Sequence, residues 1–155
     1  MAVLRDATVR DAKVRVLIID DSETMRKIVE AALHHIVPHL GEVLHAANGM
    51  EGLAAMEKST AEGQPLSLVL CDVHMPTMDG LKFLLEKQRR NLAQNVPVAM
   101  ITAGACDPQL LRAMAAGAQC HLSKPFTLEQ FARCVSSLLP LHSAPATADK
   151  TEAVR

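Results

Sequence analysis

Short, continuously apolar segments alternate along this chain with longer segments in which apolar residues recur every three or four positions. The first apolar segment runs from Val14 to Ile19. The helical pattern after it consists of Met25, Ile28, Val29, Ala32, Leu33 and Ile36. Apolar runs of this length are typical of strands buried on both faces of a parallel sheet. The alternation therefore predicts an α/β fold in which helices cover both faces of one sheet.

The same order is repeated four more times. Further strands are expected at residues 43–47, 66–71, 98–101 and 118–122, with a polar loop at 58–65. Capping residues mark the helix starts: Ser22, Asn48 with Glu51, Asp107 with Pro108, and Thr127 with Gln130. The helical segments should bury Leu81, Leu84, Leu85, Leu110, Leu111, Met114, Ala118, Leu128, Phe131, Val135 and Leu138. Five strand–helix units predict a doubly wound five-stranded sheet.

The length of 155 residues fits one domain. We expect the folded part to span residues 14–139. Residues 1–13 would form an N-terminal extension, and residues 140–155, rich in Pro, Ala, Thr and Ser, a flexible tail.

Composition excludes several classes of function. The net charge of −1 gives no field that would attract nucleic acid, and three Phe with no Trp or Tyr are too few for base stacking. No apolar run approaches the roughly 20 residues of a membrane span, and the first residues lack a signal peptide's apolar stretch. The four cysteines lack CxxC spacing, which favours free thiols and a cytoplasmic location. A zinc site at His34, His35 and His39 lacks a second ligand pair.

Polar residues follow the predicted strands at the points where the strands end. Asp20 and Asp21 follow the first strand, Asp72 the third, Thr102 the fourth, and Ser123 with Lys124 the fifth. Open α/β sheets place their sites outside these carboxyl ends. Taken singly, each residue is more often structural, as a helix cap, a turn residue or a surface lysine. Their joint placement predicts a site.

Three carboxylates in one cleft repel each other unless a cation lies between them. Oxygen ligands with room for water suit Mg²⁺. A carboxylate beside a metal ion and an ammonium group can attack phosphorus, because the cations neutralise charge on the phosphoryl oxygens. The cluster therefore indicates phosphoryl transfer to an aspartate.

Four stretches together resemble the CheY-like receiver domain of response regulators: VLIIDDSETMRKIV at 16–29, LVLCDVHMPTMDG at 68–80, MITAG at 100–104 and LSKPFT at 122–127. The resemblance extends over nearly all of the expected folded part. It implies a flavodoxin-like sheet with strand order 2-1-3-4-5. It also implies a role in two-component signalling, in which the domain is phosphorylated and catalyses only its own phosphorylation and dephosphorylation.

The resemblance assigns roles residue by residue. Asp72 corresponds to the phosphoacceptor, and Asp20 and Asp21 to the acidic pair that, with Asp72 and the backbone carbonyl of His74, holds Mg²⁺. Thr102 corresponds to the hydroxyl that binds the phosphoryl group.

Lys124 corresponds to the lysine that contacts the phosphoryl oxygens, and the Lys124–Pro125 bond is expected to be cis. His121 stands at a switch position usually held by Tyr or Phe. An imidazole titrates near neutrality, so a switch there would respond to pH; the alternative is a fixed surface contact for a partner. His74 and Gly104 occupy the two positions that tune the lifetime of the phosphorylated state.

We expect a single-domain response regulator that receives its phosphoryl group from a sensor histidine kinase or a phosphotransfer protein. It would signal through a downstream protein effector, as a monomer or weak dimer, without nucleic acid or membrane insertion. Two other readings remain: an interaction module that no longer needs phosphorylation, and a phosphatase with an aspartyl nucleophile. The second lacks the DxD pattern around Asp72.

Overall fold

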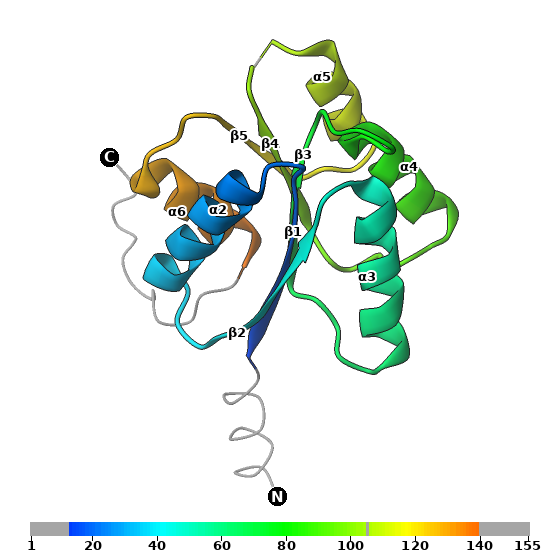
Figure 1. Ribbon diagram of the computed structural model, residues 1–155, viewed down its shortest axis with the longest axis horizontal. Coiled ribbons are helices and arrows are strands. Elements are labelled where there is room, and N and C mark those ends of the chain that lie inside the picture. Colours follow the sequence, from blue (N-terminus) through cyan, green and yellow to red (C-terminus); the bar gives the residue numbers. More distant parts are fainter. Residues whose placement is uncertain (1–12, 105, 140–155) are drawn as a thin grey trace, which may run out of the picture.

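A computed structural model, which describes residues 13–104 and 106–139, places five parallel strands in one sheet with helices on both faces (Figure 1). The strands are β1 (Val14–Ile19), β2 (Leu40–Ala46), β3 (Leu68–Asp72), β4 (Val98–Thr102) and β5 (Cys120–Ser123). Their order is β2-β1-β3-β4-β5, which confirms the predicted topology. The expected flexible tail and nearly all of the N-terminal extension, residues 140–155 and 1–12, lie outside the described residues.

Five helices cover the sheet: α2 (Glu23–Ile36), α3 (Gly49–Ala61), α4 (Gly80–Arg89), α5 (Pro108–Ala115) and α6 (Leu128–Leu138). In Figure 1, α2 and α6 lie on one face, and α3, α4 and α5 on the other. Strands β3 and β4 are buried at every residue, which requires cover on both faces. Two hydrophobic clusters result, one beneath each helix layer. No helix among the described residues is long and apolar enough to cross a membrane.

The predicted helix caps are present. The Ser22 hydroxyl accepts a hydrogen bond from the Met25 amide at 3.1 Å, and Thr127 and Gln130 cap α6 reciprocally. At α3, Asn48 caps as expected, but the Glu51 carboxylate accepts from the amide of Ala47 rather than of Asn48. These caps fix where each helix starts, directly after the strand end that precedes it.

Predictions about one loop and about residues on three helix faces were wrong. The polar segment 58–65 is not a loop throughout, because α3 continues to Ala61 and buries Ser59 against the core. The helix face of α5 was also misjudged. Leu111 is 64% exposed, since Leu110 and Ala113 already occupy the side that faces the sheet. Leu85 and Leu128 are exposed as well, whereas Leu84 and Phe131 are buried.

The chain between β3 and α4 returns closely over the end of β3. The Gly80 amide donates to the Val73 carbonyl at 2.8 Å. A Cβ atom on Gly80 would lie 2.3 Å from the Asp72 carbonyl oxygen, a distance that no side chain permits. This close approach requires glycine and fixes the backbone that carries Asp72.

Candidate functional site

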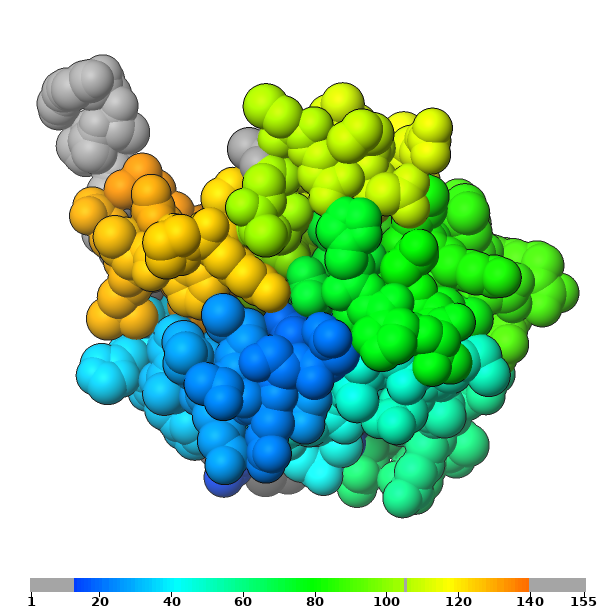
Figure 2. Space-filling model, turned by 45° about the horizontal axis from the view of Figure 1, so that its top comes forward, coloured from blue at the N-terminus to red at the C-terminus, as the bar shows by residue number. Residues whose placement is uncertain are grey.

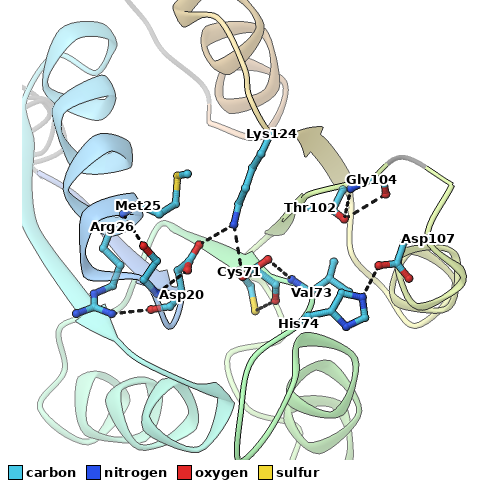
Figure 3. Close-up of polar contacts among 12 residues, drawn as sticks. Asp20, Met25, Arg26, Cys71, Val73, His74, Thr102, Gly104, Asp107 and Lys124 are labelled. Atoms are coloured by element: carbon cyan, nitrogen blue, oxygen red, sulfur yellow. Dashed lines mark hydrogen bonds and ion pairs between the residues drawn. The ribbon is translucent and has the colours of Figure 1, made fainter.

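The carboxyl ends of β1, β3, β4 and β5 meet at one edge of the sheet, which brings Asp20, Thr102 and Lys124 to the same edge (Figure 3). Side-chain oxygens of Asp20, Asp21 and Asp72 lie within 4.8 Å of one another. Within residues 13–104 and 106–139, this is the only group of three or more potential His, Cys, Asp or Glu ligands. The space-filling view shows the start of α2, the segment after β3 and the segment after β5 meeting on this side (Figure 2).

Asp72 is the last residue of β3 and only 8% exposed. Its Oδ1 accepts a hydrogen bond from the Val73 amide at 2.8 Å, and its Oδ2 lies 3.5 Å from the ammonium of Lys124. Burial raises the pKa of the Asp72 carboxyl, and the charge of Asp20 raises it further, while Lys124 and the Val73 amide act in the opposite direction. The ionised form of Asp72 is therefore less stable in the folded protein than it would be in water.

Asp20 is buried and Asp21 exposed, although they are neighbours at the end of β1. Asp20 Oδ1 accepts from the Ser22 amide at 2.9 Å, and its backbone carbonyl accepts from the Arg26 guanidinium at 2.6 Å. One acid is thus fixed by the start of α2, and the other faces solvent beside it. A cation from solution can reach the group through the Asp21 side.

Lys124 follows β5 and extends its ammonium toward Asp20 (Figure 3), where it also reaches Asp72. The Nζ–Oδ2 distances are 3.1 Å to Asp20 and 3.5 Å to Asp72. The Lys124 amide donates to the Thr102 carbonyl at 2.7 Å, and the Lys124–Pro125 bond is cis, as predicted. One ammonium contacts two of the three clustered carboxylates, so negative charge remains in excess.

This donor set fits Mg²⁺. Clustered carboxylate oxygens, one of them open to solvent, are what a hard cation that keeps several waters requires. Burial raises the pKa of Asp72, so its ionised form is disfavoured where it lies, and a cation beside it would offset that cost.

Thr102 is fully buried at the end of β4, and its hydroxyl is turned toward its own loop. Oγ1 accepts from the Gly104 amide and lies within donating distance of the Gly104 carbonyl, both at 3.2 Å (Figure 3). In this state the hydroxyl makes no hydrogen bond to Asp72 or Lys124 among the described contacts. To donate to a phosphoryl oxygen, the hydroxyl would have to give up its donation to the Gly104 carbonyl.

A contact that sequence reasoning missed joins His74 to Asp107. His74 lies two residues after Asp72, and its Nε2 contacts Oδ2 of Asp107, the N-cap of α5 (Figure 3). The Gln109 amide and the His74 ring together lower the pKa of the Asp107 carboxyl. The contact connects the loops after β3 and β4 beside Asp72. No sequence signal marks a pair 33 residues apart on two different loops.

His121 is exposed on β5, opposite Met100 of β4. Its neighbour Leu122 is buried beneath α6, so the alternation of the strand directs His121 to the other face of the sheet. Its assignment as a switch stays a prediction.

The model of the response regulator receiver domain family matches residues 16–136. The chain belongs to this family. The receiver is 32% identical to the chemotaxis protein CheY1 of Helicobacter pylori over 113 residues, which cover 73% of this chain and 86% of that protein.

Solved structures agree. The receiver resembles the chemotaxis protein CheY4 of Vibrio cholerae, with a TM-score of 0.70 and 29% identity over 83% of this chain and 100% of that one. It also resembles a structure of the CheX–CheY–BeF3–Mg²⁺ complex from Borrelia burgdorferi, with a TM-score of 0.67 and 26% identity over 80% and 87% of the two chains. The chain is thus a CheY-like receiver domain of two-component signalling.

Proposed function

We propose that this receiver accepts a phosphoryl group on Asp72 from a histidine kinase or phosphotransfer protein, in a Mg²⁺-dependent reaction, and signals by altered protein–protein contacts. The observation that carries the proposal is the placement of the Lys124 ammonium between two buried carboxylates, with a third beside them. Such a group of like charges costs stability, and a structural role does not account for it.

In the proposed reaction Asp72 acts as the nucleophile. An Asp72 oxygen attacks phosphorus, a P–O bond forms, and the bond from phosphorus to the donor breaks, so that the donor leaves with the bonding electrons. The Lys124 ammonium, already 3.5 Å from Asp72, is positioned to contact a phosphoryl oxygen. The Thr102 hydroxyl, once released from Gly104, supplies a further hydrogen bond.

Asp20, Asp21 and Asp72, with the backbone carbonyl of His74, would hold Mg²⁺. When bound, the ion supplies positive charge that offsets the carboxylates and the phosphoryl oxygens. The related CheY of Borrelia burgdorferi, solved with BeF3 and Mg²⁺, supports this assignment.

The signalling part of the proposal rests on the relatives. The matched segments make up 86% of CheY1 and 100% of the CheY4 chain, so those two consist of little more than the matched domain. By analogy we propose a single-domain regulator, cytoplasmic and monomeric or weakly dimeric, whose output is a protein effector rather than nucleic acid or a membrane. The only catalysis proposed is that of its own phosphorylation and dephosphorylation. The Borrelia CheY in complex with CheX is one example of a protein partner.

Intact-mass spectrometry after incubation with acetyl phosphate tests the proposal. One phosphoryl addition is expected with Mg²⁺ present and none after chelation of the metal. A protein that stays unlabelled with Mg²⁺ would instead be an interaction module that keeps the fold alone. Release of phosphate from unrelated monoesters would point to a phosphatase.

A further inference from the structure

Two cysteines outside the acidic site face each other between β5 and α6. The Sγ atoms of Cys120 and Cys134 lie 2.9 Å apart. Cys120 is half-buried at the start of β5, whereas Cys134 is 6% exposed in the middle of α6. Neither residue has a part in the chemistry of Asp72. We call these two residues the thiol pair.

The fold brings the thiol pair together through ordinary packing. Cys134 belongs to the hydrophobic cluster beneath α2 and α6, together with Leu122 and Phe131, and Cys120 packs against that cluster. Cys120 and Leu122 point to the same face of β5 because side chains alternate along a strand. The α6 helix docks on that face and places Cys134 opposite Cys120.

We propose that the thiol pair is an oxidative modification site, at which a peroxide converts Cys120 and Cys134 into a disulfide that links β5 to α6. A disulfide bond is about 2.05 Å long, so the two sulfurs must approach by about 0.9 Å from their separation of 2.9 Å. The other cysteines are differently placed. Cys71 is buried in the opposite cluster, and Cys106 is exposed.

The reaction proceeds in two steps. The more accessible Cys120 sulfur attacks one peroxide oxygen, the O–O bond breaks, and the leaving hydroxide takes the thiol proton as water. Cys134 then attacks the sulfur of the Cys120 sulfenic acid. The S–O bond breaks, and the departing hydroxide takes the Cys134 proton as a second water. Two thiols are oxidised by two electrons, and one hydrogen peroxide is reduced to two waters.

The environment supports this order of events. Burial and the neighbouring Cys120 sulfur raise the pKa of the Cys134 thiol, so Cys134 is the less reactive of the two thiols and the more accessible Cys120 meets the peroxide first. The product joins residues 14 positions apart in the chain. Because β5 also leads to His121 and Lys124, the disulfide would fix α6 to the strand that carries them.

Peptide mapping of the native full-length chain tests the proposal. Trypsin cleaves after Lys and Arg, except before Pro, and should place the four cysteines in four separate peptides: 59–82, 91–112, 113–133 and 134–150. After treatment with hydrogen peroxide and alkylation of the remaining thiols, peptide 113–133 should be linked to 134–150. A reductant should release them.

Control variants distinguish a specific reaction of the thiol pair from random oxidation of cysteines. Cys106→Ser should form the link as wild type does, whereas Cys120→Ser and Cys134→Ala should not form it. In the Cys134→Ala variant, Cys120 should stop at the sulfenic acid, which dimedone traps. The link should form several times faster in native protein than in urea. Oxidation of Cys106 without any link, or equal rates in native and unfolded protein, would overturn the proposal.

Discussion

The ammonium of Lys124 lies 3.1 Å from Oδ2 of Asp20, although 104 residues separate the two in the chain. Its distance to Asp72 is longer, 3.5 Å. In this state the lysine therefore pairs chiefly with Asp20 rather than with Asp72, the proposed acceptor. A phosphoryl group on Asp72 would offer the ammonium new oxygens, so this ion pair is the contact we expect phosphorylation to change.

Lys124 contacts Asp20 and Asp72, whereas Mg²⁺ would be bound by these two residues and by Asp21. Substitutions of Asp21 and of Lys124 should therefore change the affinity for Mg²⁺ differently. Asp21→Ala removes a candidate ligand and should weaken Mg²⁺ binding by at least about tenfold. Lys124→Ala removes a competing cation and should leave binding unchanged, or tighten it by up to about tenfold. Calorimetric titration with Mg²⁺ measures both. Equal losses of affinity would show that the roles are divided wrongly.

The buried charge of Asp72 should make the unmodified protein less stable. Because its folded-state pKa is raised, mainly by burial, the native state binds a proton more readily than the unfolded chain. Asp72→Asn should therefore stabilise the metal-free protein at neutral pH by about 1 kcal/mol. The gain should shrink as pH falls through the folded-state pKa toward the ordinary value of 3.8, since wild type then becomes neutral at this position. Urea unfolding at several pH values measures the difference, and a destabilised mutant at neutral pH would contradict it.

Gly80 lies against the backbone of Asp72, where a side chain would not fit. Gly80→Ala places a Cβ atom 2.3 Å from the Asp72 carbonyl oxygen and should lower the free energy of unfolding by about 2–3 kcal/mol. Gly104→Ala is the matched control, because nothing lies within 4 Å of its added Cβ atom. Its unfolding free energy should stay within about 0.5 kcal/mol of wild type. Similar stabilities of the two variants would show that the loop over Asp72 adjusts freely.

The contact of His74 with Asp107 connects the two loops beside Asp72. His74→Asn and Asp107→Asn each remove it, and asparagine keeps the cap at α5. If the contact limits access to Asp72, both variants should be labelled by acetyl phosphate a few times faster than wild type, because the two loops are then no longer held together. His35→Asn, an exposed substitution on α2, serves as the control. Time courses of intact mass decide this, and wild-type rates in both variants would exclude a role for the contact in access.

The residues at the strand ends predicted the grouping of Asp20, Asp72 and Lys124, because the carboxyl ends of parallel strands lie at one edge of a sheet. The sheet order was predicted only through the resemblance to the receiver family, because strand ends and spacing do not show which strands are neighbours. The sequence did not predict the side-chain pairs that join separate elements. The contacts of His74 with Asp107 and of Cys120 with Cys134 arise only when loops and helices dock.

The errors of detail have the same cause. Ser59 looked like a loop residue, but packing of α3 buries it, and tertiary packing overrides a weak local propensity. Leu111 looked like a core residue because its neighbour Leu110 is one, and the direction of the α5 face is set by how the helix docks.

Labelling of matched variants tests the central claim most directly. Wild type, Asp72→Asn and Asp79→Asn are incubated with acetyl phosphate and Mg²⁺, and their intact masses are compared. Asp79 caps α4 a few residues from the acceptor, and asparagine preserves that cap. We predict one phosphoryl addition on wild type and on Asp79→Asn, and none on Asp72→Asn. An undiminished addition on Asp72→Asn would contradict the assignment of Asp72 as the acceptor.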